Sequence, residues 1–198
     1  MSILSKSELK KIYNREIEFL LDGIKNSNNP YHFFYLSTIS KNSPHVRTVV
    51  LRNISKNPLK IYFNADVRSP KVSQLLENPN CSILFYDNSR RVQLRFNCKA
   101  KVHNKNNYTR IIWDSTPLQS RKCYMGLFSP SKKVDDYEPN IPAKYLKSDP
   151  IKSDSEKGYM NFTSIELEVF NSDILELHHD GHIRFNLDSR NNISFVAP

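Results

Sequence analysis

The chain has 198 residues, of which 38% are hydrophobic and 11% aromatic, and its formal net charge is +9. This length and apolar content suit a folded domain with a buried core and exclude a wholly disordered chain. Its four glycines lie far apart, which excludes the Gly-rich phosphate-binding loops of Rossmann and Walker type.

The first predicted element is an amphipathic helix over about residues 5–27. Apolar residues recur at three-and-four spacing from Leu9 to Ile24, which is the pattern of a helix with one buried face. Ser5 begins the pattern of a capping box at its start. The Asn-rich stretch 26–29, which precedes a proline, ends it.

Antiparallel strands are predicted next. Residues 31–40 are aromatic and apolar, and a turn at 41–44 leads into a second strand over 45–53. After another turn at 56–58, apolar and polar residues alternate over 59–64. This order predicts a meander of neighbouring strands.

A short helix and two further strands follow. The helix is predicted over about 69–77, because Pro70 suits a first helical turn. Residues 81–86 form an apolar strand. The long strand that begins at Arg91 has the strictest alternation, with apolar residues at the even positions of 92–102.

The second half of the chain mixes helices, a loop and strands. Residues 107–123 are predicted as two helical pieces separated at Pro117, and 129–150 as a long loop rich in Pro, Lys, Asp and Ser. Residues 162–196 return to strands. Together these elements indicate one mainly β domain over 1–198, a small antiparallel barrel with helical additions.

The cysteines and the N-terminus indicate a cytoplasmic protein. Cys81, Cys98 and Cys123 are odd in number and lack CxxC spacing, so they are expected as reduced thiols. No signal-peptide pattern and no stretch of membrane-spanning length is present, so no membrane partner is expected. The histidines between 178 and 182 surround an Asp-Gly turn without fixed ligand geometry, so no metal is expected either.

Three basic clusters are candidates for binding an anion, and they lie at 47–52, 68–71 and 91–93. The first has an arginine at each end of a predicted strand. The second opens a helix, where free backbone N–H groups and the helix dipole already favour an anion. Guanidinium groups with a lysine at a helix start suit a phosphate. The alternative is that each cluster is only a solvated face.

In this order the clusters resemble the FMN-binding core of the pyridoxamine 5'-phosphate oxidase-like flavoproteins. The resemblance rests on Arg47–Arg52, Ile61–Asn64, Arg68–Leu75, Glu77–Pro79, Ser82–Tyr86, Val92–Gln93 and Lys99–Ala100. It covers residues 31–125 well and the remainder loosely. It implies a six-stranded split β-barrel, a homodimer with FMN at the interface, and a cytoplasmic oxidoreductase.

The resemblance also implies roles for individual residues. The FMN phosphate would be held by Arg47, Arg68, Ser69 and Lys71. The isoalloxazine ring would be lined by Thr48, Val49, Val50 and Leu51, flanked by Tyr62 and Phe63, and contacted by Gln93 of the second subunit. Gln119 and Ser120 lie near the family's second flavin-contacting segment.

Arg52 is assigned to the same cofactor site, at the other end of its strand from Arg47. Because the two arginines are five positions apart, they point to opposite faces of a regular strand. Both can reach one ligand only if the strand bulges, or if one of them faces a different part of the dimer.

The residues that clamp the oxidase's phosphorylated substrate are mostly absent. Ile112 and Thr116 stand where that enzyme has Tyr and Arg, and only Ser120 matches. The sequence therefore predicts an FMN-dependent oxidoreductase that acts on a small molecule other than pyridoxamine phosphate. The alternatives are a flavin- or haem-binding protein without turnover, and a barrel that binds nucleic acid through a basic face comprising Arg91, Arg95, Lys99 and Lys101.

Overall fold

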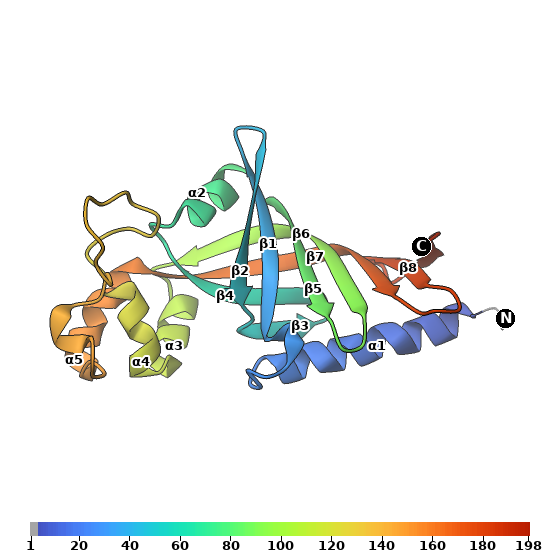
Figure 1. Cartoon of the computed structure of the whole chain (residues 1–198), viewed down its shortest axis with the longest axis horizontal. Coiled ribbons are helices and arrows are strands. Elements are labelled where there is room, and N and C mark those ends of the chain that lie inside the picture. The colour runs from blue at the N-terminus through green and yellow to red at the C-terminus, as the bar shows by residue number, and fades with distance from the viewer. Residues whose placement is uncertain (1–3) are drawn as a thin grey trace.

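The computed structural model describes residues 4–198, and helix α1 (Lys6–Gly23) is its first element (Figure 1). The predicted capping box is formed, because Ser5 and Glu8 each accept a hydrogen bond from the other's backbone N–H. The helix ends at Gly23, short of the predicted end. There the chain turns back so closely that a Cβ would lie 2.9 Å from the carbonyl carbon of Tyr31.

Within the described residues, nine strands form one antiparallel sheet. They are β1 (Phe33–Ser40), β2 (Ser43–Val50), β3 (Asn53–Lys56), β4 (Leu59–Asp66), β5 (Asn80–Asp87), β6 (Val92–Asn104), β7 (Phe162–Glu176), β8 (Ile183–Asp188) and β9 (Ile193–Phe195). The order is β2-β1-β5-β6-β7-β4-β3, with β8 beside β7 and β9 beside β8. The predicted antiparallel, mainly β class is confirmed, with nine strands where six were expected.

The predicted strand over 45–53 is two strands that meet at a corner. The N–H of Leu51 donates to the carbonyl of His32 at 2.9 Å, and the N–H of Arg52 donates to the carbonyl of Tyr62 at 2.8 Å. Within two residues the chain therefore leaves β1 and joins β4. The prediction of one continuous strand is wrong, because it could not include this change of hydrogen-bonding partner.

The core lies on the inner face of the sheet, under α1. The alternation predicted for β6 is confirmed, since Leu94, Phe96 and Cys98 are buried while the residue after each of them is exposed. Aromatic rings fill the centre, and the ring centroids of Phe34 and Phe85 are 5.0 Å apart. Cys81 is buried as well, whereas Cys123 is exposed.

The helices flank this sheet (Figure 1). Helix α2 (Pro70–Glu77) follows β4 as predicted. Helices α3 (Asn107–Ser115), α4 (Leu118–Arg121) and α5 (Lys152–Ser155) gather at one end as a helical lobe, with the predicted break at Pro117. The expected loop over 129–150 contains a 3-10 turn, Ala143–Tyr145. No helix of the described chain is long and apolar enough to cross a bilayer.

Candidate functional site

Arg47 lies on edge strand β2 and reaches across β1 to α2. Its Nη1 donates to Thr38 Oγ1 at 2.5 Å and to the carbonyl of Leu36 at 3.3 Å. Its Nη2 donates to Gln74 Oε1 at 3.0 Å, and Thr38 donates to the same oxygen at 2.6 Å. Every acceptor of this half-buried guanidinium is neutral, so its charge is held in place but not balanced.

Lys71 lies beside Arg47 in the first turn of α2. It is three residues before Gln74, which places both side chains on one helix face. Burial lowers the pKa of Lys71, and the charge of Arg47 lowers it further, while Asp66 opposes the shift. Neither cation forms an ion pair with a carboxylate in residues 4–198.

The start of α2 is open toward the same place. Ser69 occupies the N-cap position, but its hydroxyl donates to the carbonyl of Asp66 at 2.7 Å and does not cap the helix. The first turn therefore keeps its partial positive charge beside Lys71 and Arg47. Two unbalanced cations and an open helix start form a receptor for an anion with more than one charge.

Arg68, predicted as a phosphate ligand with these residues, has other partners. Its Nε and Nη2 donate to the carboxylate of Asp66 at 3.0 and 2.7 Å. Nη2 and Nη1 also donate to the carbonyls of Gly126 at 3.1 Å and Leu127 at 3.3 Å. Hydrogen bonding to Asp66 raises the pKa of Arg68. The structure thus places this guanidinium in a closed set of contacts.

Arg52 points toward the helical lobe. It lies at the corner between β2 and β3, where its side chain is exposed. Burial raises the pKa of the Tyr124 hydroxyl, and the nearby charge of Arg52 opposes this shift. Because the corner interrupts the strand, the expectation of opposite faces for Arg47 and Arg52 does not apply.

Of the residues expected around the flavin ring, some are exposed to solvent and others are buried. Thr48 is exposed and Val50 half-buried, whereas Val49 and Leu51 belong to the core. Phe63 has no exposed surface, and its ring centroid lies 5.9 Å from that of Phe34. The side chains of Val49, Leu51 and Phe63 point into the core, and the contact of these residues with a flavin stays a prediction. Only their backbone is left to contact a ligand.

The other expected flavin contacts lie apart from Arg47 within one chain. Tyr62 is on the outer face of the sheet, in register with Glu166. Gln93 is on the outer face of β6, separated from β2 by β5 and β1. Gln119 and Ser120 lie in α4 of the lobe.

Four participants were missed from the sequence: Thr38, Asp66, Gln74 and the Gly126–Leu127 backbone. The only local signal for any of them was the three-residue spacing of Lys71 and Gln74 in a predicted helix. The others come from distant parts of the chain.

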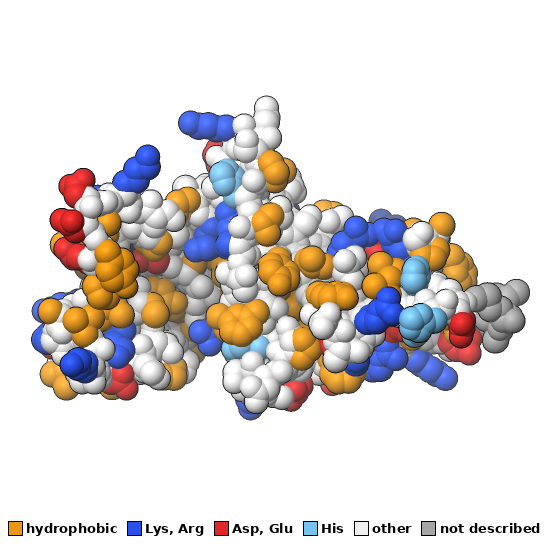
Figure 2. Space-filling model, in the orientation of Figure 1, with side chains coloured by type: hydrophobic (Ala, Val, Ile, Leu, Met, Phe, Trp, Pro, Cys, Tyr) orange, Lys and Arg blue, Asp and Glu red, His pale blue; other side chains and the backbone are white. Residues whose placement is uncertain are grey.

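The surface view shows Lys and Arg side chains along the recess between the helical lobe and the β1–β2 hairpin (Figure 2). Beside it, an apolar patch covers the outer face of β1, β2 and β5 (Figure 2). Its exposed side chains include Phe33, Tyr35, Ile39, Val46 and Tyr86. A shallow groove of about 490 Å³ crosses this face and reaches Arg95 and Asp173.

Comparison with protein families finds a match to part of the chain. The model described as "Pyridoxamine 5'-phosphate oxidase, FMN-binding domain" matches residues 13–104. Among curated proteins, pyridoxine/pyridoxamine 5'-phosphate oxidase 2 of Arabidopsis thaliana is 32% identical over 108 residues. That match covers 53% of this chain and 52% of the relative, so it spans about half the length of the relative.

Solved structures show the same fold over nearly the whole chain. A pyridoxamine 5'-phosphate oxidase-related, FMN-binding protein from Nostoc punctiforme has a TM-score of 0.71 at 21% identity, covering 94% of this chain and 97% of that one. PhzG from Burkholderia lata, in complex with tetrahydrophenazine-1-carboxylic acid, has a TM-score of 0.65 at 12% identity. It covers 100% of this chain and 98% of its own.

Proposed function

Because residues 13–104 match the model of the FMN-binding domain family of pyridoxamine 5'-phosphate oxidase, we propose that this chain binds FMN and acts as an FMN-dependent oxidoreductase. The observation that carries the proposal is the pair formed by Arg47 and Lys71. These two cations lie together at the open start of α2, and neither forms an ion pair with a carboxylate of the described chain.

The donor set fits the FMN phosphate. A phosphate monoester carries nearly two negative charges at neutral pH and presents three acceptor oxygens. Arg47 would offer the N–H groups of its fork, Lys71 an ammonium, and the first turn of α2 its dipole. The unbalanced charge, which destabilises the free protein, becomes favourable when a dianion neutralises it.

The flavin ring would lie in the recess that continues from this phosphate site. The backbone of edge strand β2 from Thr48 to the corner at Leu51 would line its path toward Arg52. Bound FMN supplies the hydride or electron transfer, and Arg52 would place positive charge where the reduced ring is anionic. In this proposal the sheet forms a split barrel whose open seam lies between the end strands β2 and β3.

A second copy of the chain would complete the site. The exposed aromatic and aliphatic side chains on β1, β2 and β5 form an apolar face of the kind that a homodimer buries. Gln93 lies on this outer face and not beside Arg47. We propose that in a homodimer it contacts the FMN held by the partner.

The substrate would be a small molecule other than a phosphorylated form of vitamin B6, because this chain lacks the residues that clamp such a phosphate in the oxidase. Thr116 donates its hydroxyl to the carbonyl of Ile112 at 2.8 Å. Arg121 is buried and donates to the carbonyls of Trp113 and Thr116 and to the side chains of Ser155 and Glu156. The groups of the lobe that could hold a second phosphate are thus engaged internally. Pyridoxamine phosphate is therefore disfavoured as the substrate.

The basic face considered for nucleic acid is largely neutralised. Arg95 forms an ion pair with Asp173, and Lys99 and Lys101 lie in register with Glu168 and Glu166. A face whose cations alternate with carboxylates offers little attraction to a phosphate backbone. Because Arg47 and Lys71 form no ion pair within the described residues, whereas the cations of this face lie beside carboxylates, a small phosphorylated ligand is favoured over nucleic acid.

The deciding experiment is retention of FMN. The purified protein is mixed with FMN, freed of excess by gel filtration, and its absorbance spectrum is recorded. Flavin bands should remain with the wild type and with Lys25→Ala, which removes an exposed lysine, and disappear with Arg47→Ala/Lys71→Ala. A colourless wild type would refute the cofactor. A yellow protein whose flavin no amine or reduced nucleotide can bleach would indicate binding without turnover.

A further inference from the structure

We infer that Arg68 is a positioning residue that fastens the loop of residues 126–140 beside the FMN site, and that it is not a ligand of the phosphate. The identity of the ligand rests on the proposed function. The contacts that fasten the loop do not, and they can be tested without flavin.

The guanidinium of Arg68 joins two segments that are far apart in the sequence. On one side it bonds the carboxylate of Asp66 through Nε and Nη2, and the backbone N–H of Arg68 donates to the same carboxylate at 2.8 Å. On the other side it donates to the carbonyls of Gly126 and Leu127. Four of its donor directions are used, so little of the fork remains for another anion.

The loop that it holds is closed by its own contacts. The N–H of Phe128 donates to Asn140 Oδ1 at 2.9 Å, and Asn140 Nδ2 donates to the carbonyl of Phe128 at 2.9 Å. The two ends approach so closely that a Cβ on Gly126 would lie 2.4 Å from the carbonyl oxygen of Asn140. The two ends of the segment 126–140 are therefore fastened to each other, and Arg68 joins them to the end of β4.

The positive charge of Arg68 is neutralised by its ion pair with Asp66. This carboxylate is buried and close enough to Lys71 to affect its pKa, so left alone it would repel a phosphate held there. Arg68 pairs with it at 2.7 Å. Once this pair is formed, the positive charge that remains near α2 belongs to Arg47 and Lys71.

The position of the loop gives it a role in flavin binding as a whole. Arg68 adjoins Ser69 and α2, so the carbonyls that it holds lie at the edge of the proposed phosphate site. The loop also carries Leu127 and Tyr137, whose side chains are 82% and 90% exposed. Releasing it should loosen one wall of the recess and weaken every flavin, with or without a phosphate.

Binding of FMN and of riboflavin, which lacks the phosphate, separates the two roles. Lys71→Ala should lower the ratio of FMN to riboflavin affinity by about tenfold or more, since a charge-assisted contact to the phosphate is lost. Arg68→Ala should weaken both flavins by the same factor, to within about twofold. A fall in the ratio as large as that for Lys71→Ala would overturn the inference.

Two further variants keep the test decisive if Arg68→Ala folds poorly. Asn140→Ala opens the loop without touching Arg68 or Asp66, and it should likewise weaken both flavins equally. Arg68→Lys retains a point charge that could reach a phosphate but cannot bridge a carboxylate and two carbonyls. FMN binding restored by Arg68→Lys would contradict the positioning role.

Trypsin digestion of the flavin-free protein tests the loop itself. The exposed loop residues Lys132 and Lys133 offer cleavage sites. Arg68→Ala and Asn140→Ala should be cleaved there severalfold faster than the wild type, and Lys71→Ala at the wild-type rate. If the wild type failed to bind FMN, the proposed function would fall while this result still stood. Unchanged cleavage in both loop variants would refute the inference alone.

Discussion

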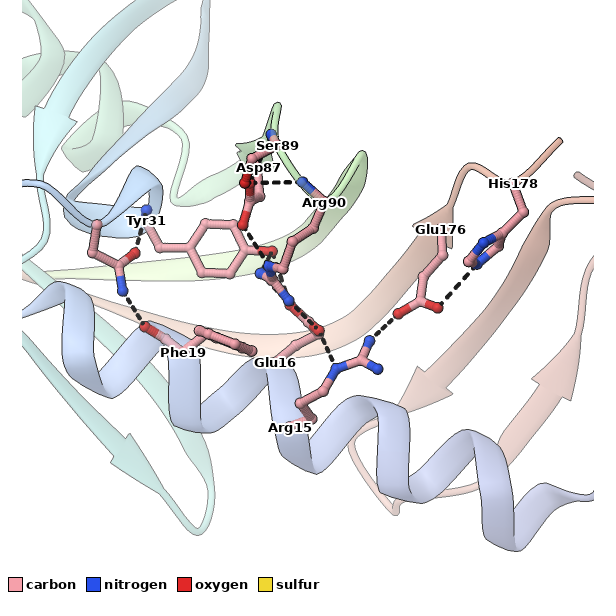
Figure 3. Close-up of polar contacts among 10 residues, drawn as sticks. Arg15, Glu16, Phe19, Tyr31, Asp87, Ser89, Arg90, Glu176 and His178 are labelled. Atoms are coloured by element: carbon pink, nitrogen blue, oxygen red, sulfur yellow. Dashed lines mark hydrogen bonds and ion pairs between the residues drawn. The ribbon is translucent and has the colours of Figure 1, made fainter.

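Two charged regions of this chain are built in opposite ways. Between α1 and the β5–β6 hairpin, each cation meets a carboxylate (Figure 3). Glu16 is only 1% exposed, yet it accepts hydrogen bonds from Arg15 at 2.8 Å and from both Nη atoms of Arg90 at 2.9 Å. The Tyr31 hydroxyl donates to it at 2.9 Å. Arg15 continues to Glu176, which lies beside His178 (Figure 3).

At the start of α2, Arg47 and Lys71 lie together, Arg47 donates to neutral acceptors only, and neither cation forms an ion pair within the described residues. Burial without a counter-charge is unfavourable for a cation, and a second cation beside it adds repulsion. A protein keeps such an arrangement where a ligand supplies the missing charge. The difference between the regions therefore separates charges that stabilise the fold from charges held for binding, and the same substitution in each should have opposite effects.

The largest effect is expected from Arg90→Met. It leaves Glu16 buried with one fewer counter-charge, which should cost about 3 kcal/mol of unfolding free energy. Affinity for FMN should stay unchanged. Urea denaturation measures the first quantity and flavin titration the second, with Arg190→Met at an exposed site as control. A loss below about 1 kcal/mol would mean that the network does not stabilise the fold as its geometry indicates.

The matched substitution Arg47→Met should reverse this result. FMN affinity should fall by about ten- to a hundredfold, because a charge-assisted contact to the phosphate disappears. The unfolding free energy should stay within about 1 kcal/mol of the wild type or rise, since an unbalanced, partly buried cation is removed. A strong loss of stability with intact FMN binding would instead assign Arg47 to the fold.

A smaller effect is expected from Tyr31→Phe. The Tyr31 hydroxyl donates to Glu16 and accepts from Arg90 at 3.0 Å, and its ring is fully buried. Removing one buried hydroxyl while the ion pair remains should cost about 1 kcal/mol in urea denaturation. FMN affinity should not change. A cost equal to that of Arg90→Met would show that the hydroxyl, and not the ion pair, holds the network together.

A feature of the fold could be predicted from the sequence when it depends on residues close together in the chain, and could not when it depends on contacts between distant segments. The alternation of β6 and the helix at Pro70 are local patterns, and both were predicted. The corner at Leu51 and the pairing of Glu16 with Arg90 depend on segments far apart in the chain, and no local pattern indicates them.

The candidate site shows the same limit. Arg47 and Lys71 could be proposed from their basic clusters, but their neutral partners Thr38 and Gln74 could not. The resemblance places Phe63 beside the flavin, whereas the alternation in β4 places the side chains of Ile61 and Phe63 on the inner face. A family resemblance named the residue, and the two-residue period of the strand shows that only its backbone can serve.

The last prediction concerns pH, and it tests whether Lys71 binds phosphate as a cation. Burial, and then the charge of Arg47, lower its pKa below the usual value of 10.5. A bound phosphate would raise that pKa again, because it favours the charged ammonium. By linkage, affinity should therefore fall as pH rises above the pKa of Lys71 in the free protein, and level off above its pKa in the complex.

The ratio of FMN to riboflavin affinity removes any titration of the flavin ring. Between about pH 7 and about pH 10 this ratio should fall severalfold in the wild type, earlier than an ordinary lysine would titrate. Lys71→Arg should keep the ratio flat over the same range, because a guanidinium stays charged. If the two profiles coincide, the cation at position 71 does not neutralise the phosphate, and the contrast between the two charged regions has a cause other than the ligand.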